Sequence, residues 1–384
     1  MKKAIIGKDI YTPLRMKGEA TILIDGDTIE NVGSQNTDGY NVIDLRKYTI
    51  IPGLVDMHIH GINGYDTMDA DPKSIEKMSK NLAALGVTSF LATTVTAPFH
   101  RIEAVLKSIK DCLEQELHGS RLLGAYIEGP YISDEYKGAH PSQFISEIDI
   151  DELKKLVEYA GEAVVAVTIA PEKPNAIKAI EYLISKNIRV TAGHTNATFA
   201  QAKAAFDAGA NIVTHLFNGM RGLNHREPGI VGAALTDQRV KVELICDLIH
   251  LAPQIMHITQ KCKGNGNVVL ITDCIVAGGL KDGQYRLGEL DIFVEDGVSR
   301  LKNGTLAGST LKLADAVKNM SLHAKIPFED ALSMATINPA KAIGKEDLIG
   351  SIEAGKKADI VALDDSSEPV FVMVGGRIVV DRTR

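Results

Sequence analysis

Cysteine is scarce in this 384-residue sequence, and its few copies are widely spaced. No C-x-x-C pair occurs, so neither a zinc ribbon nor a dithiol redox motif is present. In a chain of this length we expect reduced thiols rather than a disulfide framework. The four cysteines are Cys112, Cys246, Cys262 and Cys274.

The sequence also lacks a surplus of positive charge and any long apolar run. Lys and Arg number 42 against 49 Asp and Glu, a net charge of −7, which repels polyanions and makes nucleic acid an unexpected partner. The longest apolar stretches, such as 164–170, fall far short of the roughly 20 residues of a membrane span. Residues 1–7 lack the apolar centre and cleavage site of a secretory signal. We therefore expect a cytoplasmic protein with no membrane partner.

What remains is the composition of a globular protein, with 45% hydrophobic and 24% charged residues. The length allows two or three domains, or one large barrel with an appendage. Short isolated strands cannot bury their faces alone, so strand patterns at the two ends are expected to pair. We predict one small β-sandwich domain from residues 1–52 and 350–384. Its strand patterns are residues 20–24, 28–33, 358–363, 370–374 and 377–380.

Between the two ends, strand patterns alternate with amphipathic helices. Ile75, Met78 and Leu82 stand at helical spacing before Gly86, and Pro174 is expected to open another helix. Eight such units over residues 53–349 predict an α/β fold, a (β/α)8 TIM-type barrel. A doubly wound sheet is the alternative, because alternation does not prove closure. The strand patterns are residues 54–60, 88–94, 122–127, 164–170, 188–194, 211–215, 242–247 and 268–273, and a hairpin insertion is expected at 285–305.

Metal-competent side chains gather at the ends of these strands. His58 and His60 lie two apart in the first strand, so both face the barrel lumen. Each residue has a simpler reading, as a buried histidine or a helix cap, yet barrel enzymes build active sites at this rim. Imidazole and carboxylate ligands without thiolate fit a divalent ion, with zinc expected first and iron or manganese next. The other candidates are Glu128, His194, His215 and Asp273.

These residues, in this order, resemble the amidohydrolase superfamily, and within it the N-acetylglucosamine-6-phosphate deacetylase family. The resemblance implies that Glu128, His194 and His215 bind the main metal ion and that Asp273 is the catalytic acid and base. His58 and His60 add a second metal site, so one or two ions per subunit are expected. The similar segments are residues 125–132, 137–140, 191–197, 214–220, 226–229 and 306–309.

The resemblance also implies a set of substrate-binding residues. His140 and His250 are expected to contact the sugar and acetamide, with the backbone of Asn218 near the phosphate. Arg226 is expected to reach the phosphate bound in a neighbouring subunit, which implies a homodimer; its simpler reading is a surface ion pair with Glu227. Leu248, Cys246 and Gly219 depart from the family pattern and concern fine specificity. The full set is Ala139, His140, Asn218, Gly219, Arg226, Asp247, His250, Leu306, Ala307 and Gly308.

The implied reaction is metal-dependent hydrolysis of N-acetyl-D-glucosamine 6-phosphate to D-glucosamine 6-phosphate and acetate, a step of amino-sugar catabolism and recycling. An amide needs a strong nucleophile, and a divalent ion supplies it by lowering the pKa of water from 15.7 to roughly 7. Asp273 takes the proton and returns it to the amine, while His250 steadies the oxyanion.

Two other functions remain open from the sequence. A cyclic-amide hydrolase or deaminase of the same superfamily usually bridges two metals with a lysine after the fourth strand. Residues 168–172, Thr-Ile-Ala-Pro-Glu, offer none. A non-catalytic scaffold on the same fold commonly loses ligands, whereas all of them are present here.

Overall fold

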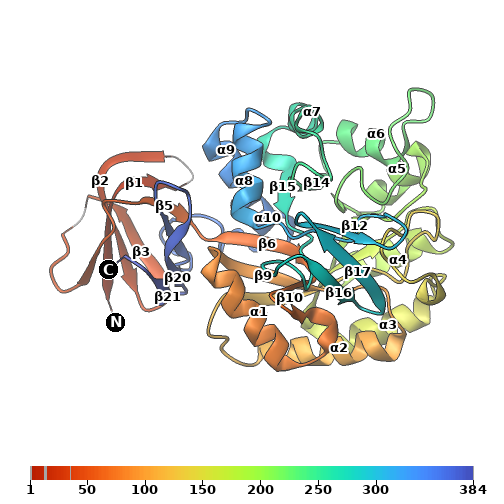
Figure 1. Ribbon diagram of the computed structural model, residues 1–384, viewed down its shortest axis with the longest axis horizontal. Helices are drawn as coiled ribbons and strands as arrows, with labels where there is room; N and C mark the ends of the chain where they lie inside the picture. Colours follow the sequence, from red (N-terminus) through yellow and green to blue (C-terminus); the bar gives the residue numbers. More distant parts are fainter. Residues whose placement is uncertain (1, 13–14, 35, 384) are drawn as a thin grey trace.

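The computed structural model describes residues 2–12, 15–34 and 36–383. It contains a mostly stranded domain that carries both chain termini and a larger domain of alternating strands and helices (Figure 1). The predicted α/β fold, with a barrel and a terminal strand domain, is confirmed.

The terminal domain is one eight-stranded sheet in the order β21-β20-β19-β5-β1-β2-β3, with β4 also paired to β1. The two chain ends meet where β19 runs antiparallel to β5 and Ile360 stands opposite Pro52. Ile360 packs into a core of this domain together with Ile5 and Phe371, whereas its neighbour Val361 packs into the core of the barrel. The strands are β1 (Lys3–Tyr11), β2 (Arg15–Asp25), β3 (Thr28–Gly33), β4 (Asn41–Asp44), β5 (Thr49–Pro52), β19 (Ile360–Leu363), β20 (Pro369–Val374) and β21 (Arg377–Asp381).

The larger domain is built on eight parallel strands, and all eight predicted strands are present. Each pairs with the next in chain order. The first and last are joined by backbone hydrogen bonds from His60 N to Cys274 O (2.9 Å) and from Asp273 N to His58 O (3.0 Å), so the sheet is a barrel and not a doubly wound sheet. The strands are β6 (Leu54–Ile59), β9 (Val87–Thr93), β10 (Arg121–Ile127), β11 (Val164–Ile169), β12 (Arg189–Ala192), β13 (Ile212–Val213), β14 (Lys241–Ile245) and β15 (Val268–Ile271).

Helix α1, one of the helices outside the barrel strands, begins and ends at residues that the sequence marks. The Asp71 side chain accepts a hydrogen bond from Lys73 N and caps the helix, and Pro72 occupies its first turn. Gly86 follows with φ 80° and ends it. The second predicted helix begins at Ala176 rather than Pro174, because Asn175 adopts a left-handed φ of 66°. No helix in the described part of the chain is long and apolar enough to cross a bilayer.

The helices are α1 (Pro72–Ala84), α2 (Phe99–Leu113), α3 (Ile150–Ala160), α4 (Ala176–Ser185), α5 (Phe199–Asp207), α6 (Gly229–Thr236), α7 (Pro253–Lys263), α8 (Leu313–Leu322), α9 (Phe328–Ser333) and α10 (Ile337–Ala342). Two short strands, β7 (Gly61–Ile62) and β8 (Tyr65–Asp66), follow β6. Between β15 and α8 lies a three-stranded antiparallel sheet in place of the expected hairpin (Figure 1). Its strands are β16 (Gly283–Leu287), β17 (Leu290–Glu295) and β18 (Val298–Leu301).

One ion pair joins the two domains. Arg121, the first residue of β10, places Nη1 2.6 Å and Nη2 3.2 Å from the two carboxylate oxygens of Asp359, which directly precedes β19. Asp359 also accepts a hydrogen bond from Gly375 N (2.7 Å), and its side chain is 4% exposed against 24% for Arg121. The guanidinium therefore neutralises a carboxylate that the domain interface has taken out of water.

We expect the change Arg121→Met to lower the free energy of unfolding by about 3 kcal/mol, because it leaves Asp359 buried without its partner. Urea denaturation followed by circular dichroism measures the loss. Lys107→Met is the matched control, since Lys107 pairs with Asp111 on the exposed face of α2 and surface pairs contribute about 0 to 1 kcal/mol. Equal losses in the two variants would contradict a special role for the interdomain pair.

Candidate metal centre and active site

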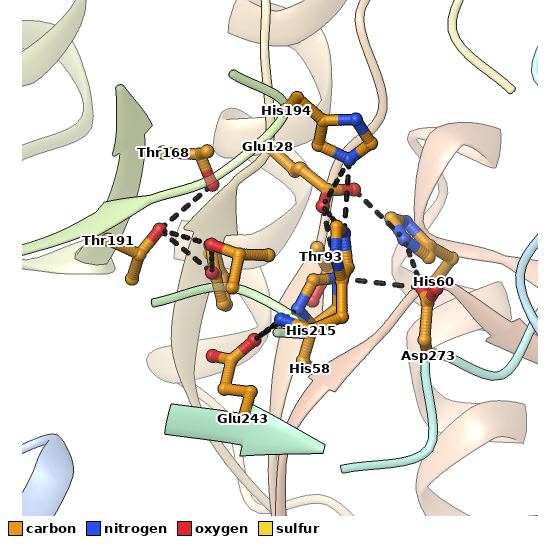
Figure 2. A network of polar contacts seen from close by, with 12 residues as sticks. His58, His60, Thr93, Glu128, Thr168, Thr191, His194, His215, Glu243 and Asp273 are labelled. Carbon is orange, nitrogen blue, oxygen red and sulfur yellow. Dashed lines mark hydrogen bonds and ion pairs between the residues drawn. The ribbon is translucent and has the colours of Figure 1, made fainter. Parts of the chain in front are cut away.

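The five predicted metal ligands and Asp273, the predicted acid and base, meet at the carboxyl ends of the barrel strands (Figure 2). They form two groups, and within each group the ligand atoms lie within 4.8 Å of one another. All six residues are buried. The first group is Glu128, His194 and His215; the second is His58, His60 and Asp273.

The first group has the arrangement of ligands around a cation. Nε2 of His194 and Nε2 of His215 lie 3.1 Å apart, and each is within 3.2 Å of Glu128 Oε1. Nδ1 of His194 faces the carbonyl of Tyr136 (3.0 Å), and Nδ1 of His215 faces that of Asn218 (3.1 Å). A carbonyl only accepts, so each Nδ1 carries a hydrogen and each Nε2 presents a lone pair. Two lone pairs and a carboxylate that converge repel one another unless a cation lies among them, so these residues fit a divalent metal ion.

The second group stands beside the first and shares its carboxylate. His60 Nε2 lies 3.0 Å from Asp273 Oδ1 and 3.3 Å from Glu128 Oε2. His58 Nε2 lies 3.5 Å from Asp273 Oδ1 and has no hydrogen-bond partner in the described part of the chain. Because Glu128 turns Oε1 toward the first group and Oε2 toward His60, the arrangement fits one ion or two.

Three of these residues lie just beyond their strands and have a left-handed backbone. We expected them to end the strands, but the strands end two residues earlier, at Ala192, Val213 and Ile271. The φ angles are 45° for His194, 26° for His215 and 49° for Asp273. A non-glycine residue in this region costs of order 1 kcal/mol or more and persists only where its surroundings enforce it. The sharp turn after each strand aims the side chain into the barrel mouth.

The carboxylates of the site are ionised despite their burial. Burial by itself raises the pKa of Glu128, but with no ion bound the protonated rings of His58 and His194 hold that pKa well below its usual range. Burial likewise raises the pKa of Asp273, yet with no ion bound the hydrogen bond from His60 and the positive charges of protonated His58 and His60 lower it to about 2. Asp273 is therefore available at neutral pH to accept a proton.

The centre opens into a pocket of about 320 Å³. Most of the predicted substrate-binding residues line it: Ala139, His140, Asn218, Gly219, His250, Leu306 and Gly308.

Two histidines in this pocket differ from the ligands in the hydrogen bonds of Nδ1. His140 Nδ1 accepts a hydrogen bond from Thr96 N (3.1 Å), so its hydrogen resides on Nε2, which faces Glu128 Oε2 at 3.4 Å. Burial lowers the pKa of His140 to about 4, and we infer a neutral hydrogen-bond donor. His250 Nδ1 instead lies 2.7 Å from Asp247 Oδ2, and because a carboxylate accepts, this Nδ1 carries a hydrogen.

Three predicted substrate-binding residues do not line the pocket of this chain. Asp247 lies behind His250 and orients its ring. Ala307 is fully buried between two residues that do line it. Arg226 is exposed on a loop, and among the described residues it forms no ion pair with Glu227, whose carboxylate accepts hydrogen bonds from Phe199 N and Gly229 N. The predicted contact of Arg226 with the phosphate bound in a neighbouring subunit therefore stays a prediction.

Two ionisable residues at the site, Glu243 and Arg300, were not among the sequence predictions. Glu243 is a fully buried carboxylate on β14, and its charge within the apolar run Val242–Ile245 was a signal that could have found it. Arg300, on β18, lines the pocket. No signal in the sequence marked Arg300, because only the fold brings this sheet to the barrel mouth.

Residues 49–379 match the amidohydrolase family. The chain belongs to this family. It is similar to N-acetylglucosamine-6-phosphate deacetylase of Vibrio furnissii, with 41% identity over 365 residues that cover 94% of this chain and 91% of the relative. It is also similar to N-acetylgalactosamine-6-phosphate deacetylase of Escherichia coli O157:H7, with 41% identity covering 88% of this chain and 89% of the relative.

The fold of this amidohydrolase agrees with solved structures. An aspartate-to-alanine mutant of N-acetyl-D-glucosamine-6-phosphate deacetylase from Mycobacterium smegmatis, in complex with N-acetyl-D-glucosamine-6-phosphate, superposes with a TM-score of 0.93. Its sequence identity is 33%, and 99% of each chain is covered.

We expect treatment with a chelator to lower the melting temperature of this amidohydrolase, because the converging lone pairs and carboxylates then lose their counter-charge. Returning zinc at 100 times its dissociation constant restores about 2.7 kcal/mol by mass action. Differential scanning calorimetry with metal analysis of the same samples makes the measurement. A His194→Asn variant should show a smaller response, and a melting temperature independent of metal in the parent protein would contradict the centre.

Proposed function

We propose that this protein is a metal-dependent deacetylase that hydrolyses the acetamide of N-acetyl-D-glucosamine 6-phosphate to D-glucosamine 6-phosphate and acetate. The observation that carries the proposal is the double ligand group with an ionised Asp273 at the floor of a sugar-sized pocket. The named activities of the relatives from Vibrio furnissii and Mycobacterium smegmatis support it.

Glu128, His194 and His215 would hold one divalent ion, and His58, His60 and Asp273 are placed to hold a second. Zinc is our first assignment, with iron or manganese as alternatives, since the donors are imidazoles and carboxylates. When bound, such an ion lowers the pKa of water and polarises a carbonyl.

Proton transfer and stabilisation of negative charge are assigned to side chains of the protein. Asp273 accepts a proton from the attacking water and delivers it to the departing nitrogen, so one carboxylate serves as base and then as acid. His140 donates from Nε2, and the pair His250 and Asp247 stabilises negative charge on the acetamide oxygen. These are preorganised donors, because Thr96 and Asp247 fix the orientation of the two rings.

The phosphate requires positive charge that the acidic chain as a whole does not supply. We assign part of it to Arg226 of the neighbouring subunit in a homodimer, as the family resemblance implies. Arg300 is the one arginine or lysine of the described chain that lines the pocket. Its Nη1 donates to Gly304 O (2.9 Å), and it has no carboxylate partner among the described ion pairs, which leaves its other donors for an anion.

Other substrates and the compartment are also part of the proposal. N-acetylgalactosamine 6-phosphate is a second candidate, because the relative from Escherichia coli O157:H7 with that activity is equally identical. Hydrolysis of cyclic amides is disfavoured, because the lysine that would bridge two metal ions after the fourth strand is missing. Strand β11 ends at Ile169, and Ala170 follows. All four cysteines are free thiols, which fits the reducing cytoplasm.

The deciding experiment measures release of acetate from N-acetylglucosamine 6-phosphate by the metal-loaded protein. We expect turnover of the phosphorylated sugar, and much slower turnover of unphosphorylated N-acetylglucosamine at the same concentration. The galactosamine epimer is measured in parallel. No turnover of either phosphorylated sugar, with bound metal verified, would contradict the deacetylase proposal.

The Asp273→Asn variant is the matched control for this assay. The amide keeps the shape of the side chain but cannot take up the proton, so turnover should fall by at least about 100-fold, the scale of general acid and base catalysis. Circular dichroism and metal analysis verify that fold and at least one ion persist. An unimpaired rate would contradict the role of Asp273.

We expect Arg300→Met to raise KM for the phosphorylated sugar about tenfold with little change in kcat, because a lost contact to the phosphate acts equally in ground and transition states. Steady-state kinetics of both sugars make the measurement. Arg286→Met is the control, since Arg286 stands in the same three-stranded sheet but does not line this pocket. A KM unchanged by the Arg300 substitution would remove this residue from the phosphate site.

A further inference from the structure

Glu243 contacts both ligand groups although it belongs to neither. Its carboxylate oxygen Oε2 lies 3.0 Å from Nδ1 of His58 and accepts a hydrogen bond from the backbone N of His215 (3.3 Å). Its backbone oxygen also accepts from Leu216 N (2.8 Å). In Figure 2 the side chain rises from β14 toward the His58 ring. One residue thus contacts the ring of a ligand in one group and the backbone of a ligand in the other.

The contact with His58 determines which ring nitrogen is left for other bonds. A carboxylate accepts only, so His58 Nδ1 carries a hydrogen and Nε2 presents its lone pair. Nε2 faces Glu128 Oε1 and Asp273 Oδ1 at 3.5 Å each. Tyr126 packs against the same ring, with centroids 4.6 Å apart and the ring planes tilted by 55°, so Glu243 and Tyr126 together hold His58 in place.

The burial of Glu243 shows that packing alone does not explain this carboxylate. The residue is 0% exposed, and its other oxygen, Oε1, has no hydrogen-bond partner among the described residues. A buried carboxylate is costly unless positive charge compensates it. No lysine or arginine pairs with Glu243 in the described ion pairs. The partner within reach is His58, so the compensating positive charge must lie on the His58 ring or on a cation bound to it.

We propose that Glu243 is a positioning residue. It orients His58 as a metal ligand, and its negative charge makes His58 Nε2 a stronger electron-pair donor to the metal ion. The proposal rests on the metal dependence in the proposed function and deepens it. Such partners of metal-bound histidines set the tautomer and raise ligand basicity, and their loss typically lowers metal affinity about 10- to 100-fold. The first ligand group has backbone carbonyls in this role, so a carboxylate partner distinguishes the His58 group.

The test is a metal titration without substrate. Chelator-treated parent protein and the Glu243→Gln variant are titrated with cobalt and zinc, with bound metal counted by elemental analysis and the cobalt absorption spectrum recorded. The amide keeps the size of the side chain and can still accept from Nδ1, so the variant removes charge with little change in shape. We expect one binding step to weaken at least tenfold and its cobalt spectrum to change, while the step assigned to Glu128, His194 and His215 persists.

Asp56→Asn is the matched control. Asp56 is also fully buried, lies on the same strand as His58 and accepts from the backbone N of His58 (3.3 Å), but its carboxylate bonds Thr272 Oγ1 (2.6 Å) and not the imidazole ring. Its substitution should leave both binding steps within about twofold of the parent protein. A Glu243→Ala variant, which removes the acceptor as well, should weaken the same step further.

Unchanged metal affinity in both Glu243 variants would overturn the proposal, as would equal weakening by Asp56→Asn and Glu243→Gln. If Glu243→Gln does not fold, Glu243→Ala decides the question by the same comparison with the control. Because no substrate enters the titration, its outcome is independent of the acetate-release assay, and failure of one does not imply failure of the other.

Discussion

Closure of the barrel is the constraint on which the functional site depends. Two backbone hydrogen bonds, His60 N to Cys274 O and Asp273 N to His58 O, join the first strand to the segment after the last. Residues far apart in the sequence thereby become neighbours, and His60 comes within 3.0 Å of Asp273. Without closure, the second ligand group would be divided between opposite edges of an open sheet. The same bonds use the backbone of His58, His60 and Asp273, so the geometry of the candidate metal centre and the integrity of the barrel depend on the same contacts.

The second constraint on the site is that its buried carboxylates need compensating partners. Glu128, Asp273 and Glu243 are carboxylates withdrawn from water, and imidazoles surround them at hydrogen-bonding distance. What the other nitrogen of each ring contacts decides its role: carbonyls behind His194 and His215, a carboxylate behind His58, a backbone N–H at His140. Histidines that look alike in the sequence thus separate into three candidate metal ligands and one candidate hydrogen-bond donor.

The terminal strand domain supports the barrel from a distance. β19 shares its alternating residues between the two cores, with Ile360 on one side and Val361 on the other, and the pair of Arg121 with Asp359 joins the domains at the amino end of β10. The site lies at the opposite, carboxyl ends of the strands. Stability and chemistry are therefore separated along the barrel axis, which is a common division of labour in this architecture.

Local signals, namely period-two patterns and the residue types at strand ends, were enough to predict the strand count, the pairing of the two ends and the six metal-competent residues. Contacts between distant elements settle barrel closure, the left-handed turns at His194, His215 and Asp273, and the placement of Asp247 behind His250 rather than in the pocket. Arg300 and Glu243 likewise could be placed at the site only once the fold showed which residues lie next to them. The physical reason is that hydrophobic periodicity is encoded along the chain, whereas the partner of each polar atom is set by elements distant in sequence.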